Sequence, residues 1–294
     1  MLGCFTEFRG TALIEESRFA RDAINDRLRA AFEGVGIITA PVLAYSFNGP
    51  TLSPTKTYRI AAWGTAFGSW NAFDTNTNAT AFDTSTGGFF TGFDGSMNDK
   101  IRLGFMTGYS NSSFHANRRS SAGSSDNYHL GLYGGTKWDA LSLRSGITYS
   151  WHEISMSRTI AFPGFVDNLS GQYDANTFQM FGELGYRIDA RIASFEPFAN
   201  LAYIKLKSDR FGEDGGAAAL AGQAGKTETT LSTLGLRASR NVTLGTISAS
   251  ARSMLGWRHA YGDITPTSTL AFYGGENFVI AGVPIAKDSG FLEL

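Results

Sequence analysis

The stretch Leu141-Ser-Leu-Arg-Ser-Gly-Ile-Thr-Tyr-Ser-Trp-His152 alternates between two kinds of side chain. Its odd positions are apolar except for Ser145, and its even positions are small, polar or charged. A period of two predicts a β-strand with one apolar face and one wet face. The strand is longer than the about 5–6 residues common in globular proteins, and a tilted strand of roughly 9–11 residues is what crosses a bilayer. The stretch therefore indicates a membrane-crossing strand.

The same alternation recurs along the chain. For example, Leu103 and Phe105 are apolar and fall on the strand face opposite to that of Arg102. We predict strands at about 58–70, 86–97, 100–110, 126–137, 140–154, 174–188, 194–207, 227–240 and 246–260, with a tenth beginning near Ser289.

The connections between these strands alternate strictly between long and short. Long polar segments lie at about 71–85, 111–125, 155–173, 208–226 and 261–288, and short links lie at 98–99, 137–139, 189–193 and 241–245. Short turns at one rim and long loops at the other are typical of antiparallel up-and-down barrels of the bacterial outer membrane. A soluble β-sandwich shows neither this alternation nor such long strands. We therefore predict an all-β transmembrane barrel.

The composition agrees with a barrel and excludes several other classes. Charged residues make up 17% of the 294 residues, below the roughly 25% usual for soluble domains. The net charge of −1 gives no indication of a nucleic-acid partner. The single cysteine, Cys4, excludes an internal disulfide framework and a cysteine-based zinc site.

Residues 11–33 are predicted to form a helix that Gly34 and Gly36 end. Its apolar stripe is narrow, and its charged face is wide. Two interpretations stay open, a solvated surface helix or linker and a charged helix lying in a polar lumen. The charged residues that we assign to a pore helix are Glu15, Arg18, Asp22, Asp26 and Arg29. Residues 37–57, with three prolines, predict an extended connector.

Several charged side chains fall on the polar phases of the predicted strands. A basic residue that faces lipid at the bilayer midplane costs about 2–4 kcal/mol, so we expect these side chains to face the lumen. They are Arg102, Arg144, Glu183, Arg187, Arg237, Arg252 and Arg258. Because this set is mainly basic and the helix carries Glu15, Glu16, Asp22 and Asp26, we hypothesise ion pairs between helix acids and lumen arginines.

The chain offers little that points to catalysis. Its four histidines lack the spacing of a metal site, and glycine-rich stretches such as Gly92-Phe-Asp-Gly95 lack the lysine of a phosphate loop. An acid and a base near the outer rim, such as His152 and Glu153, leave a barrel-embedded hydrolase as a minor alternative. We therefore expect no catalytic residue, no metal and no cofactor.

Many stretches resemble the C-terminal β-barrel translocator domain of autotransporters, the type V secretion family. They include Trp63-Gly-Thr-Ala-Phe-Gly-Ser-Trp70, Asp126-Asn-Tyr-His-Leu-Gly-Leu-Tyr-Gly-Gly135, Phe181-Gly-Glu-Leu-Gly-Tyr186, Glu196-Pro-Phe-Ala-Asn-Leu-Ala-Tyr203 and Gly256-Trp-Arg-His-Ala260. The resemblance implies a twelve-stranded barrel in the outer membrane of a Gram-negative bacterium, with a helix that threads the pore and leads to an exported passenger.

The resemblance also implies the function and the partners. The expected function is export of the domain's own N-terminal passenger to the cell surface, without enzymatic activity, and a passive porin-like barrel is the alternative. The implied partners are outer-membrane lipid, the passenger, the barrel-assembly machinery and periplasmic chaperones, and no nucleic acid.

We expect residues 1–57 to hold a passenger remnant, the linker helix and the connector, and residues 58–294 to hold the β-domain. The chain ends at Phe291-Leu-Glu-Leu294, inside the tenth strand, so about nine and a half strands are present and the last two to three of the family are lacking. Because an open sheet edge in lipid leaves unpaired backbone groups, we expect a fragment that does not close a barrel by itself.

Overall fold

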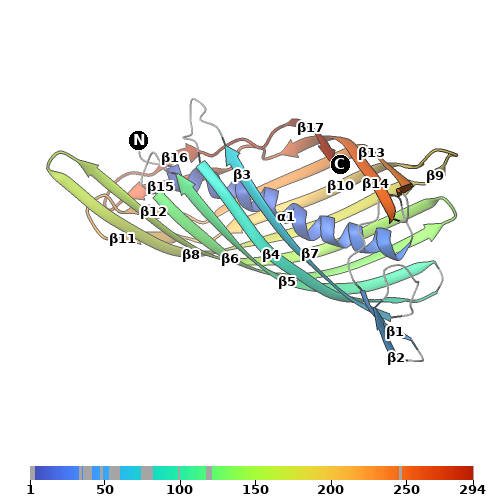
Figure 1. The fold of residues 1–294 in the computed structure, drawn as a ribbon. Helices are drawn as coiled ribbons and strands as arrows, with labels where there is room; N and C mark the ends of the chain where they lie inside the picture. The colour runs from blue at the N-terminus through green and yellow to red at the C-terminus, as the bar shows by residue number, and fades with distance from the viewer. Residues whose placement is uncertain are drawn as a thin grey trace.

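The computed structural model describes residues 4–32, 35, 42–46, 49–52, 60–73, 82–98, 100–116, 121–244 and 247–293. One helix, α1 (Cys4–Ala31), precedes a large curved sheet in the described part of the chain (Figure 1). The strands are β1 (Val42–Ser46), β2 (Gly49–Leu52), β3 (Ile60–Phe73), β4 (Phe82–Ser96), β5 (Ile101–Ala116), β6 (Ser121–Trp138), β7 (Leu141–Phe162), β8 (Phe165–Tyr186), β9 (Ile188–Asp189), β10 (Ser194–Ser208), β11 (Phe211–Asp214), β12 (Leu220–Gly222), β13 (Gly225–Leu244), β14 (Ile247–Gly262), β15 (Thr267–Phe272), β16 (Phe278–Ala281) and β17 (Asp288–Glu293).

The sheet is antiparallel and runs up and down, which confirms the predicted fold class. Its long strands pair in the order β3, β4, β5, β6, β7, β8, β10, β13, β14 and β17. Within the described residues β17 does not pair with β3, so the sheet is not closed. Over the same residues, α1 included, no helix is long and apolar enough to cross a membrane.

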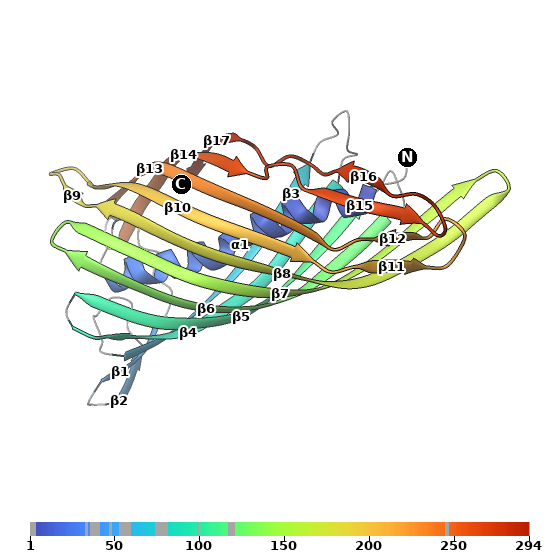
Figure 2. The ribbon, with the colours of Figure 1, turned by 180° about the vertical axis from the view of Figure 1, so that it is seen from behind.

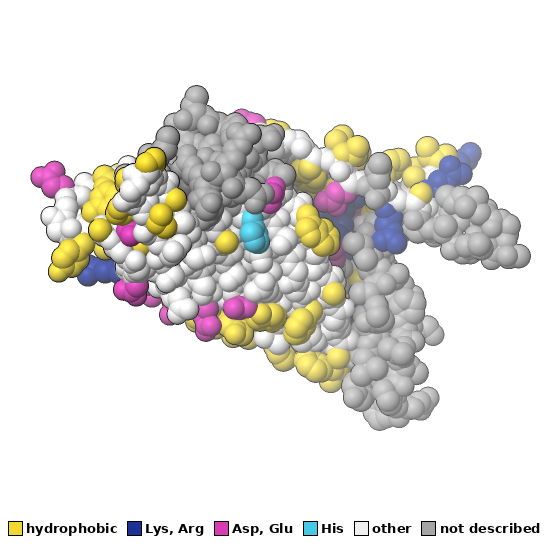
Figure 3. All heavy atoms as spheres, turned by 60° about the vertical axis from the view of Figure 1, so that its left-hand side comes forward, with side chains coloured by type: hydrophobic (Ala, Val, Ile, Leu, Met, Phe, Trp, Pro, Cys, Tyr) yellow, Lys and Arg dark blue, Asp and Glu magenta, His cyan; other side chains and the backbone are white. Residues whose placement is uncertain are grey.

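The alternation also decides which side chains each strand presents to which side of the sheet. Along β7 the even positions are buried, with Arg144 at 0% exposure and Thr148 at 2%, whereas Ile147 and Trp151 are each 47% exposed. The exposed phase carries apolar side chains on most of the long strands. On the face drawn in Figure 3, charged side chains are few and lie mostly toward the margins. This outer face suits lipid, and α1 lies along the opposite, concave side of the sheet (Figure 2).

The segment 155–173, predicted as a loop, is instead a β-hairpin. β7 and β8 continue past the rest of the sheet to Phe162 and Phe165, and the register persists through Ser157↔Ser170 (Figure 1). Gly164, with a φ of 86°, makes the turn. Small polar side chains had suggested a loop, but two long segments of one chain satisfy their backbone groups best by pairing with each other.

Other predicted bounds also differ from the structure. α1 begins at Cys4 rather than at residue 11, β5 and β6 extend well into the predicted loop at 111–125, and the loops at 208–226 and 261–288 contain β11, β12, β15 and β16. The connector at 37–57 contains the hairpin of β1 and β2, and β1 also pairs with β3. The expected end of the helix at Gly34 and Gly36 lies outside the described residues, as does most of the predicted loop at 71–85.

Glycines on the inner face make room for aromatic side chains from neighbouring strands. A Cβ atom added at Gly104 would lie 2.5 Å from Cζ of Tyr133 and 2.6 Å from Cβ of Asp94. Added Cβ atoms at Gly146 and Gly235 would likewise collide with the rings of Phe181 and Phe198. The inner face is therefore packed tightly where large rings cross small residues.

We predict that Gly104→Ala lowers the free energy of unfolding by about 1–3 kcal/mol, the usual effect of overpacking a filled interior. Urea titration in lipid or detergent measures it. Gly182→Ala is the matched control, because its added Cβ would meet nothing closer than the Arg144 carbonyl oxygen at 4.0 Å. Equal losses in the two variants would contradict the packing argument.

Candidate functional site

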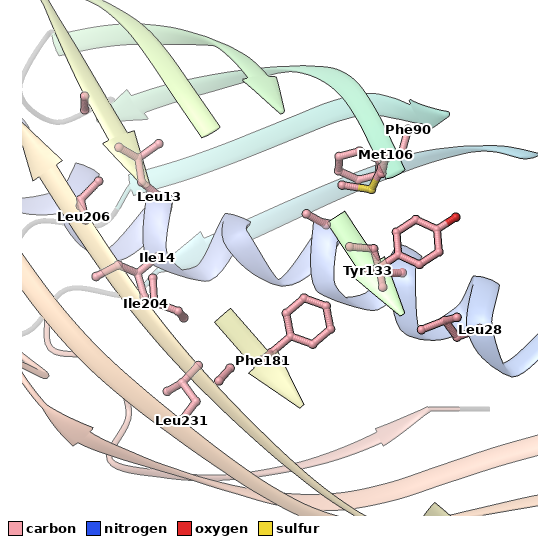
Figure 4. Packing of buried hydrophobic residues seen from close by; sticks show 14 of the residues in the cluster. Leu13, Ile14, Leu28, Phe90, Met106, Tyr133, Phe181, Ile204, Leu206 and Leu231 are labelled. Carbon is pink, nitrogen blue, oxygen red and sulfur yellow. The ribbon is translucent and has the colours of Figure 1, made fainter. Parts of the chain in front are cut away.

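The candidate site is the contact between α1 and the inner face of the sheet. Leu13, Ile14, Ile24 and Leu28 are at most 2% exposed and pack against strand side chains that include Met106, Phe181 and Ile204 (Figure 4). Charged residues of the same helix are buried as well, including Arg21, Arg27 and Arg29 at 7%, 9% and 7% exposure. Of the two interpretations of this helix, the structure therefore shows the helix in the lumen.

The two ends of α1 lie at opposite rims of the sheet. Thr11, seven residues after the start of α1, donates a hydrogen bond to the Val283 carbonyl oxygen at 2.5 Å, in the connection between β16 and β17. Lys137, one residue before the end of β6 at the short-turn rim, donates from Nζ to the Phe32 carbonyl oxygen at 3.1 Å. The helix therefore enters at the long-loop rim and ends at the short-turn rim.

Asp94, on β4, is the centre of one buried ion cluster. Arg27 of α1 donates from Nε to Oδ2 at 2.5 Å and from Nη2 to Oδ1 at 2.8 Å. Arg102 of β5 also donates to Oδ1, and the Tyr133 hydroxyl donates to Oδ2 at 2.9 Å. The Tyr133 hydroxyl in turn accepts from Nε1 of Trp63 at 2.6 Å. One carboxylate thus joins the helix to β5 and β6.

A second buried cluster joins β7, β8, β10 and β13. Arg144 donates from Nη1 to Glu183 Oε1 at 2.8 Å and to Glu196 Oε1 at 3.0 Å. Arg237 donates to the same two carboxylates at 2.9 and 3.0 Å, and its guanidinium lies 3.7 Å from the centre of the Phe198 ring. Two arginines and two carboxylates therefore neutralise each other on the inner face of the sheet.

Glu16 of α1 is held by neutral donors rather than by a cation. Its Oε1 accepts hydrogen bonds from Ser110 at 3.0 Å, Ser112 at 2.8 Å and Asn127 at 2.9 Å. The network continues from Asn127 Oδ1 to His152 Nδ1 at 2.7 Å, and from Ser110 to His129 Nε2 at 3.0 Å. Two neighbouring strands, β5 and β6, thus bind one helix carboxylate directly, and His152 of β7 contacts it only through Asn127.

Several other charged residues of α1 line a cavity of about 290 Å³ between α1 and the strands β10, β13, β14 and β17. Arg21, also on its wall, is fixed by a 2.6 Å hydrogen bond from Nη1 to Gln179 Oε1. Glu15 pairs with Arg258 at 3.4 Å, and Arg29 pairs with Asp26 within the helix. The cavity is lined among others by Arg18, Asp22, Asp26, Arg29, Arg252 and Arg258.

Arg187, which we predicted to face the lumen, directly follows the last residue of β8. It lies at the short-turn rim and donates from Nε to Asp189 Oδ1 at 2.9 Å and Oδ2 at 3.0 Å. Hydrogen bonds from the Ser194 hydroxyl and from Arg187 hold the pKa of the Asp189 carboxyl, which is outside the membrane-spanning part, below its usual value.

The hypothesis of helix acids paired with lumen arginines fits one contact, Glu15 with Arg258, and is wrong for Glu16 and Asp26. In the stronger ion pair the helix supplies the cation and the strand supplies the anion, because Arg27 of α1 pairs with Asp94 of β4. Sequence reasoning did not assign Asp94 or Glu196 to the lumen. The alternation of β4 and β10 could have identified them. Phe93 and Pro197 occupy outward positions, so their neighbours Asp94 and Glu196 face inward.

An open-ended curved sheet with an apolar outer face and a charged helix against its inner face defines an outer-membrane β-barrel domain with an internal helix. The chain belongs to the autotransporter β-domain family, whose model matches residues 62–294. This membership confirms the resemblance drawn from the sequence and places the domain in the outer membrane of a Gram-negative bacterium.

Two curated relatives from Serratia marcescens, each named extracellular serine protease, are 39% and 37% identical to the chain over 284 residues. These alignments cover 96% of this chain and 26% of each relative. The chain thus spans about a quarter of the length of the curated relatives it matches.

Solved structures share the fold at low sequence identity. The translocator domain of the autotransporter NalP from Neisseria meningitidis is 14% identical, with a TM-score of 0.61 over 97% of this chain and 95% of that one. The β-domain of the Bordetella autotransporter BrkA is 16% identical, with a TM-score of 0.57 over 80% and 93%.

We predict that Asp94→Asn lowers the free energy of unfolding by about 3–5 kcal/mol, because two buried arginines lose their shared anion. Adding Arg27→Met to Asp94→Asn should lose less than the sum of the two single changes, because the residues act as one unit. Asp189→Asn breaks an exposed pair and should change stability little. Thermal or urea unfolding followed by tryptophan fluorescence measures all four variants. Strictly additive losses would show that the pair is not coupled.

Proposed function

We propose that this chain is the translocator domain that brings an N-terminally attached passenger to the cell surface, and that α1 is the part of the exported polypeptide left in the pore. The observation that carries the proposal is the position of α1, buried against the inner face with its start at the long-loop rim. Long loops face the outside in barrels of this kind, so a polypeptide ahead of α1 would lie outside the cell.

The length of the helix supports the same proposal. α1 has 28 residues, which at 1.5 Å per residue gives about 42 Å. A bilayer measures about 30 Å across its hydrocarbon core and about 40–45 Å with its headgroups. One helix of this length therefore connects the two sides of the membrane through the lumen, as a tether between an external passenger and β3 requires.

The relatives are named extracellular serine proteases, which fits a domain that exports an attached enzyme. We propose that the β-domain itself catalyses no reaction. In support, the inner-face histidines, His129 and His152, are both engaged by hydroxyl or amide groups of neighbouring strands. We further propose the barrel-assembly machinery and periplasmic chaperones as partners in assembly.

Surface export tests the proposal directly. An epitope is fused ahead of Cys4 in a chain supplied with a secretion signal and the flanking sequence of its reading frame. We expect a protease added to intact cells to remove the epitope, because the start of α1 opens to the outside. An epitope that stays protected until the outer membrane is permeabilised would indicate a passive pore with a plug.

The matched control carries the same epitope between Ala190 and Arg191, at the short-turn rim. We expect this epitope to be protected in intact cells and cleaved after permeabilisation. Cleavage at both positions in intact cells would show damaged membranes rather than export.

A further inference from the structure

Three lysines lie together on the outer face of β10 and β13, at the edge of the apolar surface. Along β10 the outward positions are first apolar and then basic, in the order Pro197, Ala199, Leu201, Tyr203, Lys205 and Lys207. Lys226 is outward on β13 and lies directly opposite Lys207 in the register. We call Lys205, Lys207 and Lys226 the lysine cluster.

The carboxylate of Glu228 lies between two lysines of this cluster. Glu228 Oε1 lies 3.2 Å from Nζ of Lys205 and 2.9 Å from Nζ of Lys226, and it accepts a 2.8 Å hydrogen bond from the Tyr203 hydroxyl. The Asp263 carboxylate, on the connection after β14, accepts a hydrogen bond from the Glu228 backbone nitrogen at 3.1 Å.

The cluster carries more positive than negative charge at its outer edge. Like charges directly opposite each other in a sheet destabilise it, yet Lys207 and Lys226 occupy such a pair. Lys207 is exposed and has no ion pair among the described residues, and the Lys226 side chain is 52% exposed. The Lys207 ammonium group is therefore unpaired in the described part of the chain, and the Lys226 ammonium group, although it pairs with Glu228, stays exposed enough to share an external anion with Lys207.

The position of the lysine cluster relative to the bilayer indicates where that anion would lie. Tyr203 is the last aromatic side chain on the outer face of β10, and aromatic girdles mark the two interfaces of a membrane barrel. Lys205 and Lys207 follow within two and four residues, about 7 and 13 Å along the strand. This is the long-loop rim, so the lysines lie at the headgroup layer of the outer leaflet.

We propose that the lysine cluster binds the phosphorylated headgroup of a lipid in the outer leaflet. Ammonium groups form charge-assisted hydrogen bonds with phosphate oxygens, and the acyl chains of the lipid would lie on Leu201 and Tyr203 below. The site needs the outer-membrane location of the domain and does not depend on the proposed export of a passenger. Loss of lipid binding and loss of export are therefore separate outcomes.

The test measures binding of the full chain to vesicles of phosphatidylcholine with diphosphorylated lipid A, and to vesicles in which both phosphates of the lipid A have been removed. The variant Lys207→Gln/Lys226→Gln should bind the phosphorylated vesicles about 25-fold more weakly, about fivefold for each lysine. Its binding to the dephosphorylated vesicles should not change. The control, Lys100→Gln/Arg191→Gln, removes two exposed charges at the opposite rim and should bind as the unchanged chain does.

A variant of opposite sign guards against a loss that is merely structural. Glu228→Gln removes the anion between the lysines and should strengthen binding to the phosphorylated vesicles several-fold. Weaker binding in Glu228→Gln, equal losses in the two double variants, or binding that ignores the phosphates would each overturn the proposal. Inorganic phosphate bound by the chain as tightly as the vesicles would overturn the assignment to a lipid.

Discussion

A charged side chain on the inner face of a membrane-crossing sheet needs a partner that neither lipid nor a neighbouring apolar residue supplies. Asp94 and Arg102 meet this need across two strands, and Arg27 of α1 completes the cluster. Removing two ions from water costs several kcal/mol, so such clusters contribute little net stability. What they determine is position, because the charges are satisfied when the helix lies at one depth and one rotation.

The outer and inner faces of each strand serve different surroundings, and the period of two makes this possible. Ile147 and Trp151 are outward on β7, whereas Arg144 and Thr148, on the alternate positions, face the interior. A slip of one residue in register would exchange these sets and put an arginine into lipid. The ion pairs of Arg144 with Glu183 and Glu196 thus depend on the same register that keeps the outer face apolar.

Much of the fold could be predicted from the sequence, because alternation is a local signal. The two-sided character of β7 follows from residues two apart, and the up-and-down order follows from the alternation of long and short connections. The predicted loop at 155–173 was wrong because Ser155 and Ser157 resemble loop residues, while their pairing with β8 depends on a partner about 15 residues away.

The candidate site could be predicted less well for a related reason. The pattern indicates that Arg102 and Asp94 share a face, but not which helix residue reaches them across the lumen. Asp94 stands between Phe93 and Gly95 and resembles a turn residue by type. Its role depends on the depth of α1, which local periodicity does not encode.

The depth of α1 has a consequence for the proposed export. A shift by one helical turn moves each side chain by about 5.4 Å. Such a shift would separate Arg27 from Asp94, and it would separate Glu16 from its donors Ser110, Ser112 and Asn127. These two sets of contacts lie at different places along the helix. Breaking one buried ion pair costs about 3–5 kcal/mol, so the helix has one strongly preferred position. A polypeptide that moves outward through this lumen would therefore stop where the two sets of contacts form together.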